Sequence, residues 1–167
     1  MNSVSRSCYL AAALAMTVTV AHAEAPGFVD APGETRIAIV HAQGAQVYEC
    51  KSDAAGKLAW QFREPIATLF VNGKTVGRHY AGPNWELTDG SIVSGNVTGR
   101  APGAAANDIP LLKLAVTSQH SSGALTGVTT IQRLNTKGGH ASGPCVRAGE
   151  MLSMPYAADY TFLRKAD

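Results

Sequence analysis

The sequence has few cysteines and lacks the short spacings that usually hold a metal ion. Its three cysteines are Cys8, Cys50 and Cys145, so no C-x-x-C pair occurs. The five histidines stand singly, without an H-x-H or H-E-x-x-H motif. Such spacings bring two ligands to one turn or one helix face, where both can bind zinc. We therefore expect neither a metal ion nor any other cofactor.

Motifs of nucleophilic and dinucleotide-dependent enzymes are also missing. The chain contains no G-x-S-x-G, and no G-x-G-x-x-G follows a predicted strand. The first motif presents a serine on a sharp strand-to-helix turn, and the second lets the backbone approach a pyrophosphate. The sequence therefore indicates no catalytic residue, and we expect a protein without enzymatic activity.

Neither sign of charge predominates. Fourteen Lys and Arg stand against 12 Asp and Glu, for a formal net charge of +2, and the basic residues are scattered singly. A nucleic-acid-binding protein concentrates its basic residues in a patch or stripe. We therefore expect no nucleic-acid partner.

Long apolar runs are absent except near the N-terminus, where residues 9–21 read YLAAALAMTVTVA. This run is shorter than the roughly 20 residues that a membrane-spanning helix needs. It follows Arg6 and leads into Ala21-His22-Ala23, an A-x-A cleavage pattern. These features predict a signal peptide over residues 1–23, cleaved near Ala23, and a secreted or periplasmic protein with no membrane span in its mature chain. An uncleaved membrane anchor is the alternative.

Cleavage would remove Cys8 and leave Cys50 and Cys145. Two cysteines in an exported chain favour a disulfide, because the compartment is oxidising. The sequence therefore predicts a bridge between Cys50 and Cys145. Two separate buried thiols are the alternative.

The mature chain alternates between short apolar-polar runs and turn clusters rich in Gly, Pro, Asn and Asp. The candidate strands are Arg36–His41, Ala45–Lys51, Leu58–Phe62, Ala67–Val71, Thr75–Ala81, Trp85–Leu87, Ile92–Thr98, Leu111–Ser118, Val128–Asn135 and Tyr156–Arg164. Runs of this spacing predict an all-β fold, either an antiparallel β-sandwich or a flattened barrel of about nine or ten short strands with little helix. Asn72-Gly73 is the strongest hairpin signal.

We expect residues 24–35 to be an extended lead-in and residues 36–167 to form a single domain. In the last candidate strand, alternation places Tyr156, Ala158, Tyr160 and Phe162 on one face. A helix over Ile109–Val116 is the main local alternative to a strand, because Asp108 could cap it and Pro110 could occupy its first turn.

The most distinctive stretch is GRHYAGPNWELTDGS, residues 77–91. It reads as two strands joined by a tight turn, with His79 flanked on its own face by the small residues Gly77 and Ala81. The space beside His79, together with the aromatic bodies and polar tips of Tyr80 and Trp85, suggests a ligand-binding site of His79, Tyr80 and Trp85. The competing interpretation is that all three are core residues.

Several segments, in order, resemble the DUF3455 family of uncharacterised secreted bacterial and fungal proteins. They are Gln46–Cys50, Trp60–Phe62, Val76–Glu86, Asp89–Ser91, Ile109–Leu112, Ile131–Gly139, Cys145 and Pro155–Tyr160. The chain departs from the family pattern at Leu111, where the family often has Trp. The resemblance implies one exported domain and places both cysteines at recurrent family positions. Some fungal members carry the name malate dehydrogenase, which the missing dinucleotide motif contradicts here.

Together these observations favour an exported, non-catalytic module that binds a small ligand or a protein partner. A hydrolase or a metal-dependent oxidoreductase centred on His79 is the first alternative. A structural envelope or surface protein is the second.

Overall fold

The computed structural model describes residues 27–120 and 122–166, and these form eight antiparallel strands closed into one barrel. Each strand pairs with its successor, and β8 pairs with β1, so the ring has no free edge. The predicted signal peptide, residues 1–23, lies outside the described residues. The strands are β1 (Glu34–Ser52), β2 (Leu58–Val71), β3 (Lys74–Tyr80), β4 (Asn84–Leu87), β5 (Ile92–Ala101), β6 (Leu111–His120), β7 (Thr130–Gly138) and β8 (Met151–Lys165).

The all-β prediction is confirmed, and of its two forms the barrel is the one observed. The described chain has eight strands where the sequence suggested nine or ten, because four predicted runs join into two long strands. Arg36–His41 and Ala45–Lys51 both lie in β1. Leu58–Phe62 and Ala67–Val71 both lie in β2.

Gly44 and Pro65 stand in the two gaps between those runs, and both residue types usually weaken a strand. Gly44 is paired with Ala67, and a side chain at Gly44 would collide with the β2 backbone. Glycine therefore lets β1 and β2 keep pairing where they approach most closely. A bulge leaves Arg63 unpaired with β1, which turns Phe62 and Pro65 to the same side of the strand.

The core lies inside the barrel and follows the predicted alternation. Tyr156, Ala158, Tyr160 and Phe162 of β8 are all buried, with relative exposures of 5% or less. The largest fully buried side chains are Trp85, Tyr160 and Phe162. Aromatic rings thus supply much of the volume that fills the barrel.

The predicted hairpin at Asn72-Gly73 is present between β2 and β3. Asn72 has φ of 50° and Gly73 has φ of 73°. Both values lie in the left-handed region that a two-residue type I′ turn requires, and its twist matches that of the flanking strands. The Asn-Gly dipeptide therefore fixes this part of the β2–β3 register.

Residues 27–33 form turns packed against the barrel wall. Val29 is fully buried, and its carbonyl accepts a hydrogen bond of 2.6 Å from Gln132 Nε2. The carbonyl of Asp30 accepts one of 2.9 Å from Lys113 Nζ. This segment therefore covers the outer faces of β6 and β7 at these positions.

The helix alternative over Ile109–Val116 is not what the structure shows, because β6 begins at Leu111. Asp108 instead accepts hydrogen bonds from the backbone N–H groups of Ala105 and Gly138, which ties the β5–β6 loop to β7. The described part of the chain contains no helix long and apolar enough to cross a membrane.

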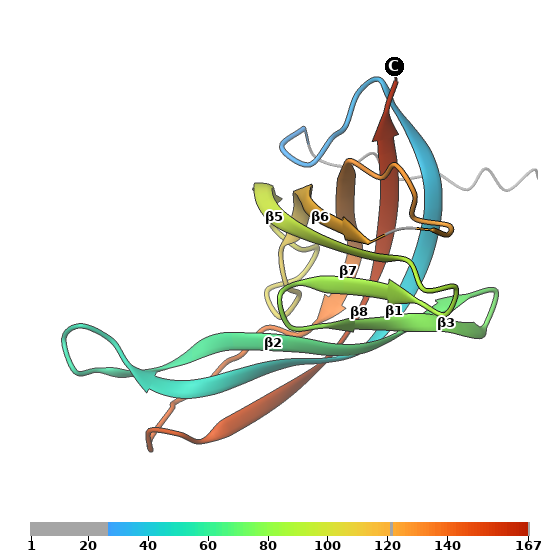
Figure 1. Ribbon diagram of the computed structural model, residues 1–167. Helices are drawn as coiled ribbons and strands as arrows, with labels where there is room; N and C mark the ends of the chain where they lie inside the picture. The colour runs from blue at the N-terminus through green and yellow to red at the C-terminus, as the bar shows by residue number, and fades with distance from the viewer. Residues whose placement is uncertain (1–26, 121, 167) are drawn as a thin grey trace, which may run out of the picture.

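The predicted disulfide between Cys50 and Cys145 is present, with Cα atoms 5.6 Å apart. Figure 1 shows the β1–β2 hairpin and the start of β8 extending beyond the barrel. Cys50 lies on this extension, and its backbone also exchanges hydrogen bonds with Gly149 and Glu150. The bridge therefore fastens the loop before β8 to the extension.

Candidate functional site

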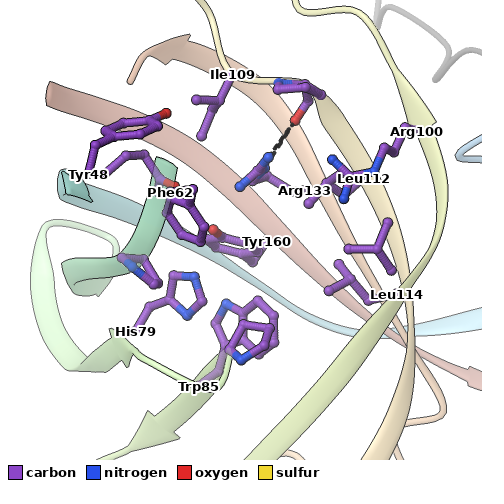
Figure 2. Close-up of a pocket in the computed structure, with 15 residues that line it drawn as sticks. Tyr48, Phe62, His79, Trp85, Arg100, Ile109, Leu112, Leu114, Arg133 and Tyr160 are labelled. Atoms are coloured by element: carbon purple, nitrogen blue, oxygen red, sulfur yellow. Dashed lines mark hydrogen bonds between the residues drawn. The ribbon is translucent and has the colours of Figure 1, made fainter. Parts of the chain in front are cut away.

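A cavity of about 300 Å³ lies inside the barrel, beside the base of the extension. Its apolar walls come from β2, β6 and the segment before β6, through Phe62, Ile109, Leu112 and Leu114. Its buried polar side chains come from β1, β3, β4, β7 and β8. They are Gln46, His79, Trp85, Arg133 and Tyr160, shown with their neighbours in Figure 2.

His79 and Trp85 enter the cavity wall from adjacent strands. They are cross-strand partners in the β3–β4 hairpin, and their rings stack with centroids 4.4 Å apart. Gly77 permits this packing, because a side chain there would collide with the backbone at Glu86 on β4. The tight hairpin turn and the missing side chain thus place both rings inside the barrel.

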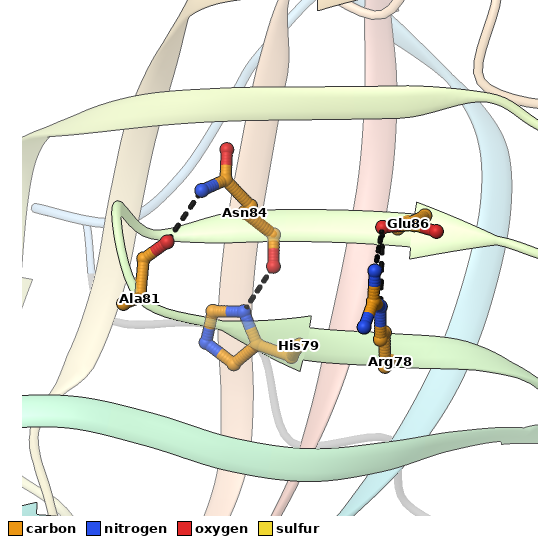
Figure 3. Close-up of polar contacts among 5 residues, drawn as sticks. All are labelled: Arg78, His79, Ala81, Asn84 and Glu86. Atoms are coloured by element: carbon orange, nitrogen blue, oxygen red, sulfur yellow. Dashed lines mark hydrogen bonds and ion pairs between the residues drawn. The ribbon is translucent and has the colours of Figure 1, made fainter.

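The ring of His79 is held in one tautomer. Its Nδ1 lies 2.8 Å from the carbonyl oxygen of Asn84. Figure 3 marks this contact with a dashed line. A carbonyl only accepts hydrogen bonds, so Nδ1 carries the proton and Nε2 is the acceptor of the neutral ring.

Burial lowers the pKa of His79 to about 3, and the positive charge of Arg133 acts in the same direction. The hydrogen bond to Asn84 partly opposes this shift. His79 is only 3% exposed, so water does little to stabilise a charged ring. The imidazole is therefore neutral at ordinary pH.

Tyr80, the third residue of the predicted site, does not share the cavity. It lies on the outer face of β3, where the guanidinium of Arg78 sits 4.7 Å from its ring centroid. Arg78 also pairs with Glu86 at 2.8 Å on the same outer face. The structure therefore brings His79 and Trp85 together and places Tyr80 apart from them.

Arg133 is buried in the cavity wall, with 8% of its surface exposed. Its Nε and Nη2 donate to the carbonyl oxygen of Pro110 at 3.1 and 2.9 Å. It is the cross-strand partner of Leu112 on β6 and Tyr160 on β8. Within the described ranges, Arg133 forms no ion pair with an Asp or Glu. The cavity wall thus contains a buried cation that donates to a neutral carbonyl oxygen and pairs with no carboxylate among the described residues.

Several buried polar atoms around the cavity have no hydrogen-bond partner among the described residues. Three of them belong to cavity-lining side chains: Gln46 Nε2, Trp85 Nε1 and the hydroxyl of Tyr160. Figure 2 shows the Tyr160 hydroxyl between the Arg133 guanidinium above it and the His79 and Trp85 rings below it. Leaving a buried donor unpaired usually costs about 1–3 kcal/mol, so such groups tend to mark places where another molecule binds.

The tyrosine hydroxyls of this region remain protonated. Burial raises the pKa of Tyr160. The charge of Arg133, and the approach of the Tyr156 and Arg133 side chains to the hydroxyl, only partly offset the effect. Burial also raises the pKa of Tyr156, whose hydroxyl is another unpartnered group. Both side chains can therefore donate a hydrogen bond at any ordinary pH.

The acid–base chemistry available here is limited. Asp159 pairs with His41 at 2.8 Å, but that pair lies on the exposed side of β1 and β8. Asp89 accepts hydrogen bonds from the backbone N–H groups of Ser91 and Ala124, so its carboxylate stabilises the local turn structure. In the ranges that the structure describes, no cluster of three or more His, Cys, Asp or Glu could hold a metal ion.

Gln46, Arg133 and Tyr160 belong to this site although the sequence pattern did not point to them. Alternation grouped Tyr160 with Tyr156, Ala158 and Phe162 on one face of the last strand, without indicating a role in binding. Arg133 carried a usable signal, because it follows Ile131 on the inward face of β7. A basic residue in an inward-facing series is unusual and indicates a buried charge with a role.

Comparison with known proteins agrees with the sequence resemblance. A family described as "Protein of unknown function (DUF3455)" matches residues 31–73 and 70–164. No curated protein and no solved structure matches the chain. Because the match spans most of the chain, this protein belongs to the DUF3455 family.

Proposed function

We propose that this DUF3455 member is an exported, non-catalytic binding protein that holds a small ligand in the barrel cavity beside His79 and Trp85. The cavity is about 300 Å³, at the lower end of the range typical of small-molecule sites. Its walls are mainly apolar with a few convergent polar groups, the usual composition of such sites.

The unpartnered donors around the cavity carry this proposal. Gln46, Trp85 and Tyr160 each bury a polar atom that has no partner among the described residues. A core selected only for stability would favour apolar side chains at these positions, because an unpaired buried donor is costly. A ligand that accepts hydrogen bonds from these atoms would remove that cost.

The protonation states favour binding over catalysis. A general base works best when its pKa lies near the working pH, whereas the pKa of His79 is about 3. The same holds for the tyrosines, whose pKa values are raised by burial. Each group is thus suited to orient a ligand and poorly suited to exchange protons with it.

Export is part of the proposal, and two features support it. The N-terminal charge, apolar run and A-x-A pattern are typical of a signal peptide. The bridge between Cys50 and Cys145 is of the kind found in oxidising compartments.

A thermal-shift screen tests this function by comparing the wild type with a variant whose cavity mouth is filled by a large side chain. Val97 lines the cavity and is 38% exposed, so Val97→Trp should fill its mouth at little cost to the core. Val146, 72% exposed and not part of the cavity lining, gives the matched control Val146→Trp. The screen would cover small aromatic and aliphatic acids, amides and alcohols.

At least one compound is expected to raise the melting temperature of the wild type and of Val146→Trp by several degrees, because binding only the folded state stabilises it. Val97→Trp should not respond to that compound. The proposal is wrong if no compound shifts the wild type, or if Val97→Trp responds like the control.

A further inference from the structure

Arg133 is the buried group of the cavity whose charge the fold leaves without a counter-ion. The guanidinium is always protonated in proteins, and it is 8% exposed here. Burying an unpaired charge is unfavourable unless an opposite charge approaches it. Every ion pair found among the described residues joins other side chains.

The hydrogen bonds to Pro110 leave one edge of the Arg133 guanidinium without a charged partner, and the neutral hydroxyl of Tyr160 lies near the group. Nε and Nη2 both donate to the carbonyl oxygen of Pro110, so this side of the fork is occupied. The opposite edge, between Nη1 and Nη2, keeps one N–H on each nitrogen. That edge matches the two oxygens of a carboxylate, which arginine binds through two parallel hydrogen bonds. The contact with Pro110 holds the plane of the group in place.

Among the described residues no carboxylate competes for Arg133, and the polar side chains of the cavity are neutral groups that can donate hydrogen bonds. The hydroxyl of Tyr160 lies on the paired strand and is unpartnered, as is Nε2 of Gln46. Among the residues that the structure describes, no Asp or Glu lines the cavity. The charged side chains of its lining are Arg133 and the exposed Arg100. Among the described residues, the cavity therefore presents positive charge and neutral polar groups, and no negative charge, to its contents.

The remaining surface determines the rest of the ligand. Ile109, Leu112 and Leu114 form an apolar wall, and the stacked rings of His79 and Trp85 form another. One buried cation neutralises one negative charge, whereas a second negative charge would itself be buried and unpaired. A volume of about 300 Å³ also limits the ligand to a small body.

From these contacts we infer that the cavity selects a small monocarboxylate with an apolar or aromatic body, whose carboxylate binds the free edge of Arg133 and the Tyr160 hydroxyl. The inference rests on the binding function proposed above and names the chemical class of its ligand. The apolar body lies against Leu112, Leu114 and Trp85.

Two isosteric probes test it without any mutation. 2-Naphthoate and 2-naphthamide have the same ring system and differ in the charge of the group offered to Arg133. Isothermal titration calorimetry on the mature, disulfide-bonded protein is expected to show naphthoate binding at least tenfold more tightly than naphthamide. Equal affinities would overturn the inference and leave a binding cavity without charge selection.

Variants of the two cavity-lining arginines then test which of them causes the preference for naphthoate over naphthamide. Arg133→Gln should reduce the naphthoate affinity at least tenfold and leave that of naphthamide within about threefold, because only the charge-assisted contact is lost. Arg100→Gln, which removes the same charge from an exposed position, should change neither by more than about threefold. A naphthoate preference that survives in Arg133→Gln would contradict the role of Arg133. Circular dichroism would establish that each variant is folded.

The remaining outcomes separate this inference from the function on which it rests. Binding of neither probe to the wild type would overturn the monocarboxylate assignment. The proposed binding function would be contradicted only if, in addition, the thermal-shift screen found no compound that stabilises the wild type. Displacement of naphthoate by submillimolar sulfate would also overturn the assignment, since a dianion should be a poor match for a single buried cation.

Discussion

The imidazole of His79 stacks on the indole of Trp85, with ring planes 11° apart and centroids 4.4 Å apart. Tyr160 meets both rings edge-on, at 5.0 Å from His79 and 5.1 Å from Trp85. Such stacked and edge-to-face contacts stabilise a core beyond simple burial. His79 is therefore part of the packed core and also part of the cavity wall.

The buried state of His79 predicts an acid-sensitive fold. In the unfolded chain its pKa is near 6.5, and in the folded protein it is about 3. Protonation therefore favours the unfolded state, and the contribution of the neutral ring is complete above about pH 6.5 and is lost as pH falls towards 3. We expect this residue alone to lower the free energy of unfolding by about 2 kcal/mol between about pH 6.5 and pH 4.5.

Urea unfolding at the two pH values measures this effect, with His79→Gln compared with His140→Gln. His140 is exposed, so the control removes a histidine without removing the buried one. The pH-dependent loss should persist in His140→Gln and largely disappear in His79→Gln. Identical pH dependence in both variants would show that His79 titrates normally in the folded state.

Reduction of the disulfide should destabilise the protein. The bridge joins residues separated by 95 positions, and removing a native bridge typically costs about 2–5 kcal/mol. Melting should therefore occur at a lower temperature in a thiol reductant. A Cys50→Ala/Cys145→Ala variant should melt near the reduced wild type and be insensitive to the reductant. Two titratable thiols in the unreduced mature protein would refute the bridge.

Gly44 is expected to tolerate no side chain. A methyl group there would overlap the carbonyl oxygen of Ile66 and lie 2.8 Å from Cβ of Ala67. Gly44→Ala should lower the free energy of unfolding by about 3 kcal/mol, at the upper end of usual overpacking costs. Gly27, with only Asp30 Oδ2 nearby at 3.9 Å, serves as a control whose substitution by Ala should change stability by less than about 1 kcal/mol. Equal stabilities for both variants would contradict the close approach of β1 and β2.

Export predicts a defined mature N-terminus. The A-x-A pattern ending at Ala23 places cleavage before Glu24. Intact mass of the protein recovered from periplasm or culture medium should match a chain that begins at Glu24. Full-length protein retained in the cytoplasm would argue against the signal peptide.

The strand pattern was readable in the sequence because it depends on neighbours along the chain. Alternation in β8 placed Tyr156 and Tyr160 on the inward face, and Asn72-Gly73 placed a hairpin, since both signals are local. The disulfide was predictable for a different reason. Only Cys50 and Cys145 remain after the predicted cleavage.

The closure of the barrel was not readable, because it depends on pairing between distant segments. β1 and β8 join residues more than 100 positions apart, for example Ala42 with Ala158. The length of β1 depended on Gly44, where close tertiary contact with β2 overrides the usual strand-breaking tendency of glycine. Sequence pattern therefore left the choice between sandwich and barrel open.

The residues of the candidate site also fall into two groups, those that the local sequence pattern indicated and those that only the fold brings together. Local spacing singled out His79 and Trp85, because they face each other across one hairpin, and it included Tyr80 through mere adjacency. Arg133 and Gln46 joined the site only through folding, which brings β7 and β1 to the same cavity. The sequence by itself determined which side chains turn inward, since that follows the two-residue period of a strand. Tertiary structure decided which of them meet and which buried charge lacks a partner, since both depend on contacts across the closed barrel.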